Sequence, residues 1–99
     1  MVEIEIAVPA GVDVARVTKI VEEAAGSRGL SVTMRGSLAA YPGSMHWHFK
    51  LGKQLGTLEA TLWPSGLRLW LSIQSGRTAP WVEATAHRLK SAIEARLRP

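Results

Sequence analysis

Apolar and polar residues alternate with a period of two in five segments of the chain. These segments cover residues 2–8, 30–35, 44–51, 56–63 and 67–74. A period of two sends successive side chains to opposite faces of a sheet, so each segment is predicted to be a strand with one buried face. The clearest case, 44–51, has a buried face of Met45, Trp47, Phe49 and Leu51.

Two further segments follow the three-four spacing of amphipathic helices. Asp13 is the expected N-cap of the first helix, which covers residues 14–25, and the glycine that follows ends it. The second helix begins after residues 75–77. Thr78 is its expected cap and Pro80 lies in its first turn, where proline is tolerated.

The element order β-α-β-β-β-β-α predicts an α+β two-layer sandwich. A right-handed crossover through the first helix, followed by hairpins, gives a five-stranded antiparallel sheet of order 2-3-4-5-1 with both helices on one face. Residues 36–43 have turn-forming residues and no period, so we expect a surface loop there. In topology alone this order resembles one half of the TATA-binding-protein fold, although no motif residue carries the likeness.

Composition limits the class of protein. A chain of 99 residues, 46% of them hydrophobic and 20% charged, suits a single globular domain spanning 1–99. Without cysteine there is no disulfide or thiolate chemistry, and we expect a reducing, cytoplasmic location. No apolar run reaches the roughly 20 residues of a membrane span, so no membrane partner is expected. Asparagine is also absent, as is typical of thermophile proteins.

The sheet face opposite the helices is predicted to be open and to be the binding face. Pairing of the strands places His48 opposite Glu59, Thr61 opposite both His46 and Trp70, and Ser72 opposite Glu59. We expect the binding face to contain His46, His48, Lys50, Glu59, Thr61, Trp63, Arg68 and Trp70. We expect a homodimer that covers exposed Trp63 and Trp70, with another protein partner as the alternative.

Nucleic acid is an alternative partner. The net charge of +4 and the pI near 10.1 attract polyanions. Trp63 and Trp70, beside cations on the open face, could stack on bases; these cations are Lys50, Arg68 and Arg35. Glu3, Glu5 and Glu59 are expected on the same face and would repel phosphates, so this reading is not favoured.

A metal site is the second alternative. His46 and His48, two apart on one strand, project to the same side with backbones about 7 Å apart. With Glu59 they could hold zinc or another divalent ion through three ligands and an open position, as a metal-dependent hydrolase does. The simpler reading is two half-exposed histidines with His48 paired to Glu59. His87 is expected on a helix, away from this face.

Other catalytic patterns are missing from the sequence. Asp13 is the sole aspartate and is assigned to a helix cap, so no Ser-His-Asp triad is available. No glycine-rich phosphate loop is present. We therefore expect a small binding or interaction domain without catalysis of its own and without a cofactor, self-associating or binding a partner through its open face.

Overall fold

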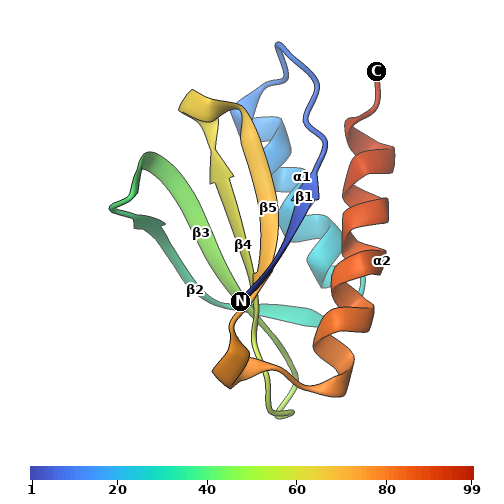
Figure 1. Cartoon of the computed structure of the whole chain (residues 1–99). Helices are drawn as coiled ribbons and strands as arrows, with labels where there is room; N and C mark the ends of the chain where they lie inside the picture. Colours follow the sequence, from blue (N-terminus) through green and yellow to red (C-terminus); the bar gives the residue numbers. More distant parts are fainter.

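The computed structural model describes residues 1–99 as five strands and two helices. The elements are β1 (Val2–Ile6), α1 (Val14–Gly26), β2 (Leu30–Leu38), β3 (Tyr41–Leu51), β4 (Leu58–Trp63), β5 (Arg68–Ile73) and α2 (Pro80–Leu97), with short 3-10 turns η1 (Pro64–Gly66) and η2 (Ser75–Arg77). The sheet is antiparallel with the order β1-β5-β4-β3-β2, which confirms the predicted α+β topology. Figure 1 shows both helices on the same side of the sheet.

The core lies between the sheet and the two helices. Trp47, Phe49 and Leu71 from the sheet are fully buried, as are Val21 and Leu89 from the helices. These are the apolar members of the alternating strands and of the helical stripes. Burial of such side chains is the main term that stabilises a domain of this size.

The predicted pairing of the central strands is confirmed. His48 pairs with Glu59 and His46 with Thr61 between β3 and β4. Thr61 pairs with Trp70, and Glu59 pairs with Ser72, between β4 and β5. The register places these polar side chains together on the face of the sheet that the helices leave uncovered, which we call the open face.

The predicted surface loop at 36–43 is wrong. β2 continues to Leu38 and β3 begins at Tyr41, so only two residues connect them. The register shifts between Gly36 and Leu38, and Gly43 has a φ of +80°. The glycines therefore mark irregular points within two long strands, because a β-bulge needs the backbone freedom that a loop also needs.

A second irregularity in β2 reverses which side chains face the helices. The register shifts between Val32 and Met34, so Met34 pairs with His48 on the open face and Arg35 pairs with Trp47. The sequence predicted Arg35 on the open face. This assignment is wrong, because one extra residue in a strand inverts the alternation beyond it.

One of the two predicted helix caps is confirmed and the other is wrong. Asp13 caps α1 as predicted, and its carboxylate accepts a hydrogen bond from the Ala15 amide at 3.3 Å. Thr78 does not cap α2: Ala79 is the N-cap, without a side-chain bond, and Pro80 is the first helical residue. Proline lacks the amide hydrogen that a cap would satisfy, and its fixed φ suits this position. Neither helix is long and apolar enough to cross a bilayer.

Candidate functional site

The open face is partly covered by the tip of the β2–β3 hairpin. The Tyr41 ring lies edge-on to the rings of Trp70 and Trp63, with centroids 4.9 and 5.2 Å apart. The Arg68 guanidinium stacks over Trp70 at 4.1 Å. Trp70 is only 2% exposed. The expectation of an exposed Trp70 is therefore wrong, because the hairpin brings an aromatic ring onto a face that strand pairing alone leaves open.

Trp63 is also held within the molecule. Its Nε1 donates a hydrogen bond to the carbonyl of Pro42 at 3.2 Å, and the side chain is half-buried. Tyr41 at the hairpin tip thus forms one aromatic group with Trp63 and Trp70. The predicted pair of exposed tryptophans that a dimer would cover is therefore not present.

The cations of the open face are largely paired. Arg68 donates to the carboxylate of Glu5 and approaches that of Glu3 at 3.4 Å, and its bond to Glu5 raises its pKa. Lys50 forms no ion pair and is half-exposed on β3. Arg35 lies on the helix side and binds Glu22 of α1. Little free positive charge remains on this face.

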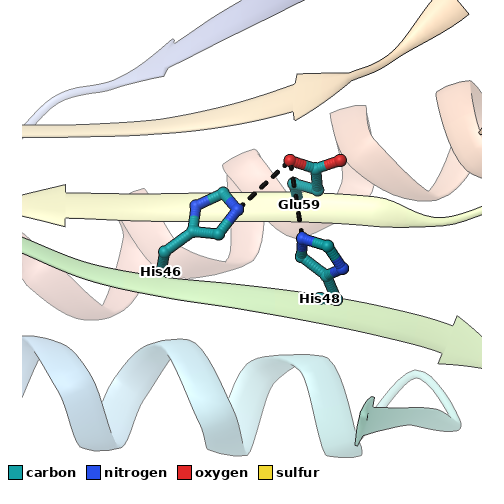
Figure 2. A group of neighbouring side chains, drawn as sticks. All are labelled: His46, His48 and Glu59. Atoms are coloured by element: carbon teal, nitrogen blue, oxygen red, sulfur yellow. Dashed lines mark ion pairs between the residues drawn. The ribbon is translucent and has the colours of Figure 1, made fainter. Parts of the chain in front are cut away.

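Two histidines converge on one carboxylate oxygen at the middle of the open face (Figure 2). His46 Nε2 lies 3.2 Å from Glu59 Oε1, and His48 Nε2 lies 3.7 Å from the same atom. His46 and Glu59 are buried, whereas His48 is half-buried. β3 supplies both histidines and β4 the glutamate, so the predicted strand pairing brings the three residues together.

Two further residues hold this cluster in place. Arg77 Nη1 donates to Glu59 Oε2 at 3.0 Å. His46 Nδ1 lies 2.8 Å from the Thr61 hydroxyl. Sequence reasoning missed Arg77, which lies in η2 directly after β5. A paired cation stabilises a buried carboxylate, and Arg77 is the first cation beyond the end of the neighbouring strand, but the sequence places Glu59 on an open face and gives no sign of its burial.

Burial controls the charge of His46. Desolvation lowers the pKa of His46 below its usual value of 6.5, and the nearby Glu59 carboxylate opposes this effect. The ring is therefore predominantly neutral at pH 7, with one N–H and one free lone pair. Thr61 can donate to or accept from Nδ1, so it can hold either tautomer of the ring.

A small hollow lies above these polar residues, and we call it the open-face hollow. Its volume is about 200 Å³. The floor is polar and buried and is formed by His46, Glu59, Thr61 and Ser72; the walls are Tyr41 and Trp70, and the rim includes Glu3 and Gln74. A larger depression beside Leu55 and Trp81 has no titratable side chain among its lining residues, so it offers little chemistry.

The predicted binding face therefore divides into a centre and a periphery. Five of its residues meet at the floor and wall of the hollow or directly beside it: His46, His48, Glu59, Thr61 and Trp70. Lys50, Trp63 and Arg68 lie around this centre.

The chain matches no family model, no curated protein and no solved structure.

Proposed function

We propose that this protein is a small binding domain and that the open-face hollow is its ligand site. The observation that carries the proposal is the buried polar floor of the hollow. Glu59 is 4% exposed and His46 is 6% exposed, on a face where solvated strands would leave such groups in water. Burying ionisable groups costs free energy that apolar side chains would avoid, and a ligand that uses these groups accounts for their retention.

The size of the hollow limits the ligand. Pockets for organic ligands usually measure about 300–1,000 Å³, whereas this one holds about 200 Å³. The ligand is therefore an ion or a molecule of few non-hydrogen atoms. Carboxylate, imidazole and hydroxyl groups on the floor favour a polar ligand. We propose binding without catalysis.

Nucleic acid fits this face less well. Trp70 is covered by Tyr41 and cannot stack on a base, and Arg68 is already paired with Glu3 and Glu5. Arg77 is paired with Glu59. A second copy of the chain is likewise less supported than a small ligand, since Trp70 is buried and Trp63 is half-buried within the chain itself.

Thermal unfolding with a panel of divalent cations and small polar amines and carboxylic acids tests this function. A ligand at about 100 times its Kd stabilises the folded state by about 2.7 kcal/mol, which corresponds to roughly 10 °C or more in Tm. We expect at least one compound to raise Tm, and we expect Glu59→Gln to abolish the rise. Glu83→Gln, on the exposed surface of α2, is the matched control, and we expect the ligand to raise the Tm of this variant as it does for the parent protein.

Two outcomes would contradict the proposal. The first is that no member of the panel raises Tm. The second is that the rise survives in Glu59→Gln, because the ligand then binds elsewhere. Each Tm shift is measured against the same variant without ligand, so a change in intrinsic stability does not affect the comparison.

A further inference from the structure

We infer that His46, His48 and Glu59 bind one divalent transition-metal ion, with Zn²⁺ as the best fit. This inference rests on the proposed function and names an ion bound at the edge of the open-face hollow, where His46 and Glu59 line it. The three side chains each offer one ligand atom, and these atoms all lie within 4.8 Å of one another. Figure 2 shows them directed toward one another from the adjacent strands β3 and β4.

The distances suit a zinc ion. Zinc binds imidazole nitrogen and carboxylate oxygen at about 2.0–2.2 Å, so two tetrahedral ligand atoms lie about 3.4 Å apart. The two nitrogen–oxygen separations here, 3.2 and 3.7 Å, lie on either side of that value. The ligand nitrogens of the two histidines lie within 4.8 Å of each other, so zinc binding requires this pair to close toward about 3.4 Å.

Arg77 and Thr61 contact atoms of Glu59 and His46 that would not bind the metal. Arg77 binds Glu59 Oε2 and so fixes the carboxylate with Oε1 directed at the histidines. Thr61 holds Nδ1 of His46, so Nε2 can present its lone pair to a metal. Hydrogen bonds of this kind to ligand side chains set the orientation and tautomer in known metal sites.

His48 distinguishes a metal site from an ordinary ion-pair cluster. Both oxygens of Glu59 already have partners other than His48, since Arg77 pairs with Oε2 and His46 pairs with Oε1. His48 Nε2 is 3.7 Å from Oε1, which is too long for a hydrogen bond, and its ring forms no other hydrogen bond within the chain. His48 Nε2 therefore lies near the other two ligand atoms and has no hydrogen bond within the chain.

The composition of the site predicts its selectivity and strength. Two imidazoles favour zinc and its neighbours, whereas magnesium and calcium prefer oxygen ligands. With three protein ligands the ion keeps an open position, which His46 and Glu59 place beside the open-face hollow. Because Glu59 also pairs with Arg77, we expect weaker binding than in structural zinc sites with four protein ligands.

The test uses the untagged full chain, treated with a chelator and titrated with Zn²⁺ by calorimetry and with Co²⁺ by visible absorption. We expect one equivalent of either ion to bind and Mg²⁺ not to bind. His48→Ala is expected to weaken Zn²⁺ binding at least tenfold, since losing a ligand costs no less than the roughly 10–100-fold loss known for the groups that support ligands. His87→Ala, the same change on the exposed surface of α2, should leave affinity unchanged.

His48 forms no side-chain hydrogen bond and is half-buried, so we expect His48→Ala to keep the circular dichroism spectrum of the parent protein. Absence of stoichiometric Zn²⁺ binding overturns the inference, as does binding that His48→Ala and Glu59→Gln leave intact. If Zn²⁺ fails to bind but a small organic compound still raises Tm in a Glu59-dependent manner, the metal inference falls and the proposed function stands.

Discussion

Glu22 is a carboxylate on α1 that joins the helix layer to two strands. It accepts hydrogen bonds from Arg35 Nε at 2.8 Å and Nη2 at 2.7 Å, and from the indole Nε1 of the buried Trp47 at 2.8 Å. The Arg35 guanidinium is the main reason that the pKa of Glu22 falls from 4.5 to about 2, and the Trp47 bond also lowers it. Sequence periodicity places Glu22 on the polar side of its helix and gives no sign of this role.

We predict that Glu22→Gln destabilises the protein by about 1 kcal/mol near pH 7, a modest value because the pair is partly exposed. The folded state favours the ionised carboxylate, so its contribution is complete above about pH 5 and is lost as the pH falls from about 4.5 to about 2. Urea unfolding at a series of pH values measures it. A difference between parent and variant that does not change with pH would contradict this account.

At the scale of elements, the sequence predicts the strands well and their irregularities poorly. The alternation of polar and apolar residues predicts β3, β4 and β5 and their pairing, because both turns between them are short. β2 could not be predicted as well, since its two register shifts follow from backbone geometry that a period of two does not encode. The fold of the hairpin tip over Trp70 depends on these shifts, so burial of that ring could not be predicted either.

The connection between β3 and β4 packs closely against the start of α2. Gly56 has a φ of +100°, and a Cβ there would lie 2.8 Å from Ala79 Cβ and 2.9 Å from Val82 Cγ2. We predict that Gly56→Ala lowers the free energy of unfolding by about 2–3 kcal/mol, from backbone strain and overpacking together. Gly52→Ala is the control: its φ of +54° is also unfavourable, but no atom lies within 4 Å, so about 1 kcal/mol is expected. Equal losses in urea unfolding would exclude the packing effect.

At the scale of the whole molecule, two helices on one face leave the other face of the sheet for function. The candidate ligands His46, His48 and Glu59 could be predicted from the sequence because spacing on β3 and pairing with β4 determine where they lie. Arg77 and the wall formed by Tyr41 could not, since Arg77 lies in the turn η2 and Tyr41 lies in the part of β3 where the sequence shows no period of two. The period of two therefore predicts which polar side chains meet on the open face, but it does not predict the residues that bury them.

The central claim is that the polar cluster on the open face holds a metal ion. Anomalous diffraction at the zinc absorption edge, from crystals grown with Zn²⁺, tests it most directly. We predict one strong peak about 2.0–2.2 Å from His46 Nε2, His48 Nε2 and Glu59 Oε1. A map with zinc only at other sites such as His87, and with the Glu59 carboxylate still shared by Arg77 and His46 alone, would contradict the claim.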